Sequence, residues 1–330
     1  MGESTAGLRV LFISPFDQAR YSHAALMQRA LERLGCRVSP LDLLAIAPWW
    51  RRLRRERVED RVQRAIAAVS PDVVLVIGAD HLSALAVHAL RDATEALWVN
   101  WIPDTETPLE TCEHAASAYD HLFVSASELA AYLVESTGTA VSFLAPACDP
   151  SVHRPLRARD QFRANVVFAG TATPRREELL TELVEFGLAL WGPGWRKTSL
   201  RDYCRGELVE VQDYVRAYAG ASVGINIHHD AAPAAGGGCN ARVFELAAIG
   251  TAQVVDDRAD LPLHFAVGSD VIAFSTVEEM RTAVRELLHE HRLAGEMGRE
   301  ARRKALASHT YMHRMLTLLS ALQSKLPARD

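Results

Sequence analysis

The stretch GGGCNARVFELAAIG, residues 236–250, decides how the rest of this chain is interpreted. Three glycines precede an apolar segment that predicts a helix over about 241–249, and Gly250 ends it. Asn240 is a good N-cap residue, and the first turn of a helix offers backbone N–H groups and the positive end of the helix dipole. Because glycine also lets the backbone approach a ligand closely, the stretch predicts a phosphate-binding site at the start of a helix.

Two charged side chains on this helix extend the prediction. Arg242 lies in the first turn and is able to add a bidentate contact to a phosphate. Glu245 lies three residues on, among apolar or small neighbours, where an unpaired carboxylate is costly and the two hydroxyls of a ribose would pair with it. The alternative is an ordinary buried helix with an Arg242–Glu245 ion pair behind a flexible glycine loop. The stretch matches neither a Walker A loop nor the dinucleotide-binding Gly-x-Gly-x-x-Gly pattern.

Composition and charge limit the classes of protein that the chain can belong to. Its 330 residues are enough for two domains that each bury a core, and its net charge of −5 argues against a nucleic-acid binder. The five cysteines form no Cys-x-x-Cys pair, which indicates a reduced, cytoplasmic protein without a zinc site. No apolar run approaches the roughly 20 residues of a membrane span, and a first strand near Leu8 leaves no room for a signal peptide.

A charge run follows two tryptophans at residues 49–61, WWRRLRRERVEDR. Docking on an anionic membrane or a lipid-linked acceptor is one interpretation of this run. Arg52–Glu56 and Arg55–Glu59 are i,i+4 partners, so a solvated helix face is favoured and membrane contact is not expected.

Apolar strands alternate with helical patterns along both halves of the chain. Strands are expected at 8–14, 37–43, 73–78, 96–102, 121–127 and 140–145, and again at 165–170, 187–192, 222–228, 252–256 and 271–274. The segment 146–163 contains three prolines and mixed charge, and it predicts a linker. Since this alternation is typical of parallel sheets covered on both faces, we predict an α/β protein with two Rossmann-like doubly wound domains facing a cleft.

Three segments of the second half resemble one family. NARVFELAAIGTAQVVDD at 240–257 resembles the donor-site segment of GT-B glycosyltransferases, specifically the CgeB-like (spore maturation protein) branch of the group 1, family 4-like transferases. HTYMHRM at 309–315 and VVFAGTATPRREELL at 166–180 are similar to the closing and opening segments of the same domain. The resemblance implies a GT-B fold, and it is weaker over the N-terminal half.

The resemblance also implies a division of labour between domains. Residues 1–155 would form an N-terminal acceptor-binding domain, and 156–309 a C-terminal domain that binds a nucleotide-diphosphate sugar. Residues 310–330 would form a helix that crosses back onto the first domain.

The candidate donor-binding residues follow the strands of the second half, where ligands bind in such sheets. In the resembled family the loop with Gly170 and Arg175 approaches the diphosphate, although arginines that are merely solvated at a helix start are the alternative. His228 is able to donate a hydrogen bond to a phosphate or a sugar hydroxyl. Lys197 is able to contact a phosphate. It lies near tryptophans in the sequence, whose commoner role is core packing. The full set is Gly170, Thr171, Arg175, Lys197, His228, Gly237, Gly238, Asn240, Arg242 and Glu245.

Polar residues also follow the strands of the first half. Asp17 and Tyr21 are candidates for acceptor binding. Asp104 is the first candidate for a catalytic or sugar-orienting carboxylate, because the resembled branch often has an acidic residue there; a helix or turn cap is the alternative. His23 or Asp17 is the second candidate for a general base.

The chain departs from glycosyltransferase family 4 at one position. Members carry two glutamates separated by seven residues, of which the second meets the ribose and the first meets the donor sugar. Glu245 matches the second, but the first falls on Gly237 here. The identity of the sugar and the stereochemical outcome therefore stay open.

We predict a cytoplasmic glycosyltransferase that moves a sugar from a nucleotide-diphosphate sugar, with UDP or dTDP favoured, to a hydroxyl or amine of a small-molecule or glycan acceptor. No metal or other cofactor is expected if arginines and a helix dipole stabilise the leaving diphosphate. The resemblance favours retention; if the enzyme inverts, Asp104 or His23 would be the base. A sugar-nucleotide epimerase or hydrolase on the same fold and a non-catalytic nucleotide-sugar-binding protein are the alternatives, and assembly as a homodimer stays open.

Overall fold

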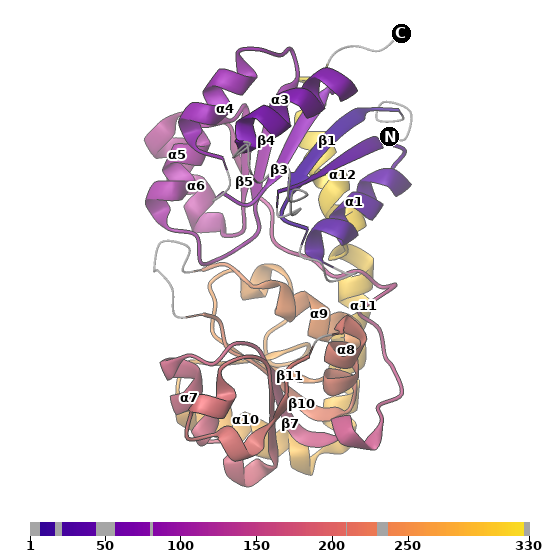
Figure 1. The fold of residues 1–330 in the computed structure, drawn as a ribbon. Helices are drawn as coiled ribbons and strands as arrows, with labels where there is room; N and C mark the ends of the chain where they lie inside the picture. Colours follow the sequence, from indigo (N-terminus) through magenta and orange to yellow (C-terminus); the bar gives the residue numbers. More distant parts are fainter. Residues whose placement is uncertain are drawn as a thin grey trace. The chain divides into compact units, whose positions relative to one another are not determined.

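The structure, a computed structural model, describes residues 7–16, 22–43, 57–79, 82–208, 210–229 and 237–326. Within these ranges the chain forms two compact units (Figure 1). Unit 1 holds the described residues up to Ala145 and those from Tyr311 onward, and unit 2 holds the described residues from Pro146 to Thr310. Each unit has its own parallel sheet and its own hydrophobic core.

Unit 1 is built on a parallel sheet whose central strands are buried on both faces. The strand order within the described residues is β2-β1-β3-β4-β5-β6, and every pair is parallel. The bounds are β1 Arg9–Ser14, β2 Arg37–Asp42, β3 Val73–Ile77, β4 Leu97–Ile102, β5 His121–Val124 and β6 Val141–Phe143. All five residues of β3, VVLVI, are buried, as expected for a parallel strand with helices on both sides.

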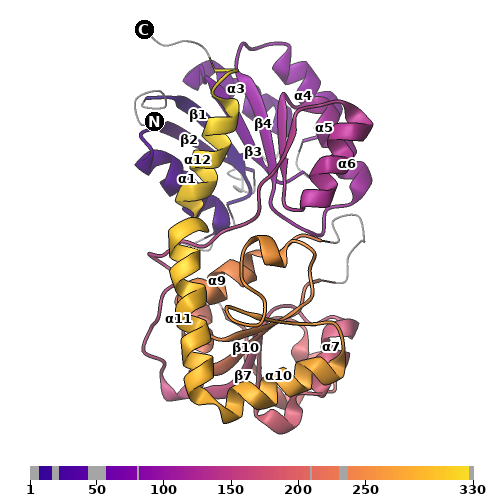
Figure 2. The ribbon, with the colours of Figure 1, turned by 180° about the vertical axis from the view of Figure 1, so that it is seen from behind.

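Helices cover both faces of this sheet (Figures 1 and 2). On one face α1 (His23–Arg33) and α12 (Tyr311–Leu322) lie side by side. The other face carries α3 (Val58–Val69), α4 (Ala84–Arg91), α5 (Leu109–Ala118) and α6 (Ser127–Thr137). The segment 309–315, which resembles the closing motif of the family, supplies packing residues to unit 1: Arg314 donates through Nε to the carbonyl of Ala145 at 2.7 Å, and Tyr311 packs against Trp101.

Unit 2 is built on a second parallel sheet with a different strand order. The order within the described residues is β12-β11-β10-β7-β8-β9. The bounds are β7 Ala164–Ala169, β8 Leu188–Trp191, β9 Cys204–Gly206, β10 Ala221–Asn226, β11 Gln253–Asp256 and β12 Ile272–Phe274. The sequence pattern does not predict β9, because this three-residue edge strand has no apolar pattern and pairs with β8 through an irregular register.

Side-chain caps start several of the helices of unit 2. The bounds are α7 Pro174–Thr181, α8 Val211–Ala219, α9 Ala241–Ile249, α10 Val277–His289 and α11 His291–Ser308, with 3-10 turns at Asp160–Phe162, Val184–Phe186, Trp195–Lys197, Arg201–Tyr203 and Leu261–Leu263. Thr276 and Glu279 form a capping box that starts α10. Gly250 ends α9 at a φ of 85°, a left-handed conformation that glycine adopts without strain. In Figure 2, α11 lies beside α9.

The predicted architecture of two doubly wound parallel sheets is confirmed, and α9 has the bounds predicted from the sequence. The sequence pattern over 276–306 predicts one helical stretch, but the structure has two helices there, because the chain leaves the helical conformation at Glu290. Within the described ranges, no helix combines the length and the apolar composition that crossing a bilayer requires.

Candidate functional site

The carboxyl ends of β7, β10 and β11 gather most of the predicted donor-binding residues in unit 2. β7 is the first strand of this unit along the chain and β10 is the fourth, yet the two are neighbours in the sheet. The chain therefore leaves them toward opposite sides, which makes the point between them the switch point where open α/β sheets bind ligands. Gly170 directly follows β7, and His228 lies just beyond β10.

The start of α9 lies at this switch point. Asn240 caps the helix by accepting at Oδ1 a hydrogen bond of 3.3 Å from the backbone N–H of Val243. Asn226, the last residue of β10, holds the Asn240 amide through two reciprocal hydrogen bonds of 3.0 Å. Among the described residues, none accepts a hydrogen bond from the backbone N–H groups of Ala241 and Arg242. These two donors, at the positive end of the helix dipole, are available to an anion.

Arg242 is a half-buried cation whose hydrogen bonding to the described residues is incomplete. Its Nη1 donates to Oδ1 of Asn226 at 3.2 Å, and its guanidinium lies 5.4 Å from the ring centre of Phe168. Nε is buried and has no hydrogen-bond partner within the described ranges. Burial alone would lower the pKa of Arg242, but two neighbouring tyrosines and Glu245 raise this pKa overall, so the side chain stays charged. A Cβ added at Gly170 would lie 3.1 Å from Nη2 of Arg242, so glycine at this position leaves room for the guanidinium.

His228 is held at both ring nitrogens. Nδ1 lies 2.6 Å from Oδ1 of Asp256, the last residue of β11, and Nε2 lies 2.9 Å from the backbone nitrogen of Asn240. Since the Asn240 N–H donates to Nε2, the ring is neutral and its proton is on Nδ1. Burial lowers the pKa of His228 below its usual value, although the bond to Asp256 opposes this effect. The predicted contact between His228 and a ligand would require one of these bonds to open.

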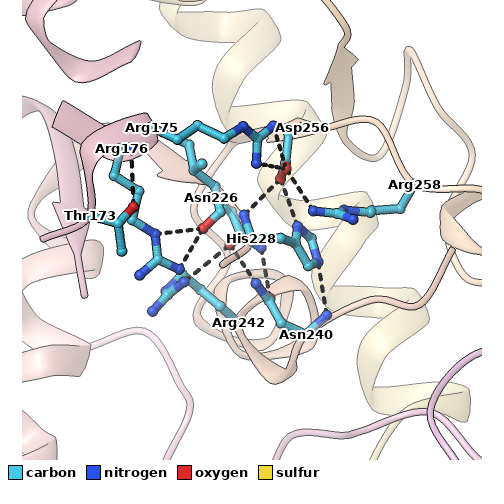
Figure 3. Close-up of polar contacts among 10 residues, drawn as sticks. Thr173, Arg175, Arg176, Asn226, His228, Asn240, Arg242, Asp256 and Arg258 are labelled. Atoms are coloured by element: carbon cyan, nitrogen blue, oxygen red, sulfur yellow. Dashed lines mark hydrogen bonds and ion pairs between the residues drawn. The ribbon is translucent and has the colours of Figure 1, made fainter. Parts of the chain in front are cut away.

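Asp256 binds two arginines in addition to His228. Figure 3 shows Arg175 and Arg258 reaching this carboxylate from two sides. Oδ2 accepts from both terminal nitrogens of Arg175 at 3.2 Å and from Nη2 of Arg258 at 3.0 Å. Burial alone would raise the pKa of Asp256, but the hydrogen bond from His228 and the charge of Arg258 hold it well below its usual range. The Arg175 side chain is 41% exposed, whereas Arg258 and Asp256 are 17% and 4% exposed.

Arg176, next to Arg175, has a different environment. It is buried, and its Nε and Nη2 donate to the carbonyl oxygen of Ile227 at 3.2 and 2.8 Å. Its Nη1 donates to the carbonyl oxygen of Thr171 at 3.0 Å, while Thr171 itself is exposed. Arg176 therefore ties the loop after β7 to the segment after β10, and the alternative of a solvated arginine does not apply to it.

Glu245 faces two side chains from distant segments. Its Oε2 accepts a hydrogen bond of 2.6 Å from the hydroxyl of Tyr214 on α8, and its Oε1 lies 3.6 Å from Nε2 of His153. Nδ1 of His153 accepts from the backbone N–H of Asp149 at 3.0 Å, so Nε2 carries the proton. Burial and the nearby Glu245 charge raise the pKa of Tyr214 well above its usual value. A ribose at Glu245, whose side chain is 8% exposed, would share the carboxylate with Tyr214 and His153.

The remaining predicted donor-binding residues lie on either side of this cluster. Gly237 and Gly238 are buried, and the carbonyl of Gly237 accepts from the backbone N–H of Asp260 at 2.9 Å. Lys197 is exposed at the end of its 3-10 turn. Trp195 is fully buried and donates through Nε1 to the carbonyl of Gly170, so core packing is the alternative that holds for this tryptophan.

The predicted residues of the first half belong to unit 1. Asp104 is exposed shortly after β4, and its carbonyl oxygen accepts from the hydroxyl of Ser125 at 3.2 Å. His23 is the first residue of α1, with its ring 6.2 Å from that of Tyr311. Asp17 and Tyr21 lie outside the described residues. The catalytic and acceptor-binding roles of these side chains stay predictions.

Sequence reasoning did not single out Asn226, Asp256, Arg258, Tyr214 or His153. Asn226 and Asp256 carry a local signal, because each is a polar residue that ends a buried apolar strand at the ligand-binding edge of the sheet. Tyr214 and His153 carry no local signal, since only the fold brings them to Glu245.

The chemistry of this cluster suits phosphate groups. It combines two backbone N–H groups that have no acceptor among the described residues, the half-buried Arg242 and two further arginines on one carboxylate. Within the part of the chain that the structure describes, no three or more His, Cys, Asp or Glu side chains are arranged to hold a metal ion.

Comparison with known proteins agrees with the fold. Residues 175–320 match the family described as Glycosyl transferase-like. No curated protein matches the chain. The solved sucrose-phosphate synthase of Thermosynechococcus elongatus is similar with a TM-score of 0.72 and 13% identity over 96% of this chain and 100% of that chain. HepE of Anabaena in complex with UDP and glucose is similar with a TM-score of 0.67 and 12% identity over 96% of this chain and 100% of that chain. A glycosyltransferase from Rickettsia africae is similar with a TM-score of 0.69 and 9% identity over 96% of this chain and 98% of that chain.

At these identities the solved structures show the fold, and the predicted GT-B architecture is confirmed. The prediction of a glycosyltransferase is confirmed at the level of the domain family. This match covers α7 from Arg175 onward, the whole of α9, and α12 as far as Ser320.

Proposed function

We propose that the chain transfers a sugar from a nucleoside-diphosphate sugar to a hydroxyl or amine of a small-molecule or glycan acceptor, with unit 2 binding the donor and unit 1 the acceptor. The observation that carries this proposal is the start of α9, where the backbone N–H groups of Ala241 and Arg242 lack acceptors among the described residues. The buried Nε of Arg242 adds a third donor without a partner in the same ranges. Such a set of donors, at the switch point of a parallel sheet, is what a diphosphate requires.

UDP is the first nucleotide to test. HepE, which shares this fold, has been solved with UDP and with UDP-glucose. In the proposal, the diphosphate lies on the start of α9 with a phosphate on Arg242, and the ribose lies on Glu245. Both side chains are on α9, so the ribose and the phosphate next to it are bound by one helix.

The reaction follows from these contacts. The bond between the anomeric carbon and the diphosphate oxygen breaks, the bond between that carbon and the acceptor oxygen or nitrogen forms, and the acceptor's proton passes to the leaving diphosphate. Arg242 and the backbone N–H groups stabilise the negative charge that develops on the leaving group. We propose that the transfer is retaining, on the basis of the resemblance, and metal-independent, because arginines and the helix dipole stabilise the leaving diphosphate. If it inverts, Asp104 or His23 takes the proton.

A cytoplasmic location is part of this proposal. It rests on the cysteines, all five of which are free in the structure, as is usual in a reducing compartment.

The test is a thermal-shift panel of UDP, dTDP, GDP, ADP and their sugars, with and without EDTA. A ligand that binds the folded state raises the melting temperature by mass action. We expect a shift with one base that is insensitive to EDTA, is lost in Arg242→Gln, and is kept in Arg303→Gln. Arg303 is a suitable control because it is an exposed arginine of the same unit, paired with Glu300 at 2.9 Å. No shift with any nucleotide would reject the donor site, and turnover of the sugar nucleotide without an acceptor would indicate a hydrolase or epimerase.

A further inference from the structure

A cavity of about 170 Å³ lies in unit 1 between α4 and α5, which are neighbours on one face of the sheet (Figures 1 and 2). For comparison, a dry apolar cavity of about 150 Å³ in a protein binds benzene. The cavity therefore accommodates an apolar group about the size of a six-membered ring. Its apolar wall consists of small residues and one leucine: Ala79, Leu82, Ala84, Ala115 and Ala118.

The cavity exists because the residues that line the two helices are small. Ala115 and Ala118 lie three residues apart and therefore on one face of α5. Ala84 is the first residue of α4, and Ser83 caps this helix by accepting a hydrogen bond of 3.2 Å from the backbone N–H of Ala86. A longer side chain at any of the three lining alanines would take up part of the cavity.

The cavity begins at the edge of the sheet where open α/β sheets bind ligands. Ala79 comes shortly after the carboxyl end of β3, and Thr111, in the first turn of α5, follows β4. Asn100 donates through Nδ2 to the carbonyl of Gly78 at 2.7 Å, which fixes the turn that leaves β3. Because unit 1 is the acceptor-binding part of the proposed function, a ligand at this edge belongs to the acceptor.

Tyr119 gives the cavity a polar group without a protein partner. This side chain is 5% exposed and lines the cavity, with its ring centre 6.4 Å from that of Trp98. Its hydroxyl forms no hydrogen bond within the ranges that the structure describes. Burial raises the pKa of Tyr119 above its ordinary value, so the hydroxyl keeps its proton and is a donor. An oxygen atom of a ligand is able to accept from it without breaking a bond to the protein.

We propose that this cavity binds an apolar, ring-sized group of the acceptor and that the Tyr119 hydroxyl donates to an oxygen atom attached to that group. The proposal names a class of acceptor, and its assignment to the acceptor rests on the proposed function above. Thr111 and His114 also line the cavity, and they are half-buried and exposed, respectively. The polar part of the acceptor lies toward these two residues, as is usual for a pocket with an apolar interior.

Saturation-transfer NMR with acetophenone and ethylbenzene tests the cavity directly. Both probes contain a benzene ring, but only acetophenone has a carbonyl oxygen. Both should bind the wild type. Tyr119→Phe should weaken acetophenone binding about 3- to 10-fold, the usual effect of losing a neutral hydrogen bond, and should change ethylbenzene binding by less than about 2-fold. Tyr132→Phe is the matched control, because exposed Tyr132 bonds Glu113 at 2.8 Å and does not line the cavity.

Two variants fill the cavity, Ala115→Leu from α5 and Ala84→Leu from α4. Each should abolish binding of both probes and leave UDP affinity unchanged, because the proposed donor contacts lie in unit 2. Ala131→Leu, at an exposed alanine of α6, is the control and should bind both probes. Melting curves identify a variant that fails to fold, and the other then carries the comparison. Probes that bind the folded variants as they bind the wild type would overturn the site.

Matched acceptor pairs test the assignment to the acceptor. With the donor that the thermal-shift panel selects, transfer is measured to benzyl alcohol and ethanol, to benzylamine and ethylamine, and to phenyl and methyl glucosides. The ring-bearing member of a pair should have the higher kcat/KM by about 10-fold or more, as expected when a ring is buried, and Ala115→Leu should remove this preference. No transfer to any ring-bearing member, or a preference that Ala115→Leu keeps, would overturn the assignment.

The same measurements separate this inference from the proposed function. If the probes bind through Tyr119 but the wild type binds no nucleotide, the cavity is a ligand site and the proposed function fails. If UDP binds but neither probe does, the proposed function stands and this inference fails.

Discussion

Each unit carries a fully buried asparagine in a central strand, and the two have different tasks. Asn100 in β4 of unit 1 donates through Nδ2 to the backbone carbonyls of Val76 and Gly78, at 3.2 and 2.7 Å. Asn226 in β10 of unit 2 pairs with the side chain of Asn240 and accepts from Arg242. Asn100 therefore satisfies backbone carbonyls of its own unit, whereas Asn226 positions a helix cap and a cation at the ligand-binding edge of its sheet. Residue type and strand position are therefore not enough to identify a functional asparagine. Its hydrogen-bond partners have to be known as well.

Arg175 and Arg176 show the same contrast one residue apart. Arg176 donates to two backbone carbonyls and is buried, so it supports the loop. Arg175 bonds a side-chain carboxylate and is 41% exposed, so it is able to exchange that partner for a ligand. A carbonyl in a folded loop is a permanent partner, but a carboxylate shared between cations is one that a phosphate is able to replace.

The largest expected effect is a loss of transfer rate, and it tests whether the two units have different roles. We expect Asp104→Ala, in unit 1, to lower the transfer rate about 10²-fold or more, because this carboxylate would orient the sugar in a retaining transfer and would act as the base in an inverting one. UDP affinity should not change, because the proposed donor contacts all lie in unit 2. Initial rates with saturating donor and titration of UDP measure the two quantities, and a drop in UDP affinity without a drop in rate would contradict the assignment.

A substitution at Glu245 in α9 is expected to affect both the stability of the fold and the affinity for UDP. We expect Glu245→Ala to lower the free energy of unfolding by about 1–3 kcal/mol, because the half-buried Tyr214 hydroxyl loses its acceptor. UDP affinity should also fall, by at most about 3 kcal/mol, if the carboxylate binds the ribose. Urea denaturation and titration separate the two effects. Tyr214→Phe is the matched variant: it removes the same hydrogen bond but keeps the carboxylate, and a fall in UDP affinity equal to that of Glu245→Ala would mean that only packing matters.

The two asparagines test the opening comparison directly. Asn226→Ala should weaken UDP binding about 10-fold, because both the cap residue Asn240 and Arg242 lose a partner. Asn100→Ala should leave UDP binding unchanged and lower the free energy of unfolding by about 1–2 kcal/mol, because two backbone carbonyls lose a donor. Titration and urea denaturation of both variants provide the check. A change in UDP affinity in Asn100→Ala would erase the distinction between the two residues.

The smallest expected effect concerns two histidines. His228 bonds a carboxylate, whereas Nε2 of His121 in unit 1 lies 2.9 Å from the hydroxyl of Ser142. Burial, with a smaller effect of the Lys325 charge, lowers the pKa of His121 to about 4 from an ordinary 6.5. The unfolded chain therefore holds a proton between these pH values that the folded chain lacks. The stabilisation of the folded state that comes from neutral His121 is complete above pH 6.5 and is lost as the pH falls toward 4.

Urea denaturation from pH 7 to 4 measures this contribution. We expect the free energy of unfolding of the wild type to fall by about 1–2 kcal/mol more than that of His121→Asn over this interval. His289→Asn, at an exposed histidine of unit 2, is the control and should follow the wild type. Parallel pH curves for His121→Asn and the wild type would mean that His121 does not titrate in this range.

Much of the fold was accessible from the sequence because its signals are local. The five buried apolar residues of β3 and the bounds of α9, between Asn240 and Gly250, follow from short stretches that need no knowledge of the rest of the chain. The edge strand β9 was not accessible, because it has no apolar pattern and exists only through its pairing with β8. The break at Glu290 between α10 and α11 was missed because no proline or glycine marks it.

The site residues also divide into those that a local sequence signal predicts and those that only the fold brings together. Arg242 and Asn240 were predicted as parts of a helix start, and the structure places them together at the switch point. Arg175 was predicted as a phosphate ligand, but its bond to Asp256 joins positions 81 residues apart and leaves no trace in either local sequence.

By itself, the sequence determined the alternation of apolar strands and helices, the capped helix at 241–249 and the resemblance to glycosyltransferases, because each is written in neighbouring residues. Only the tertiary structure decided that Asp256 would gather His228, Arg175 and Arg258. The physical reason is that a buried charge is stable only with partners, and in a parallel sheet those partners come from the ends of strands that are distant along the chain.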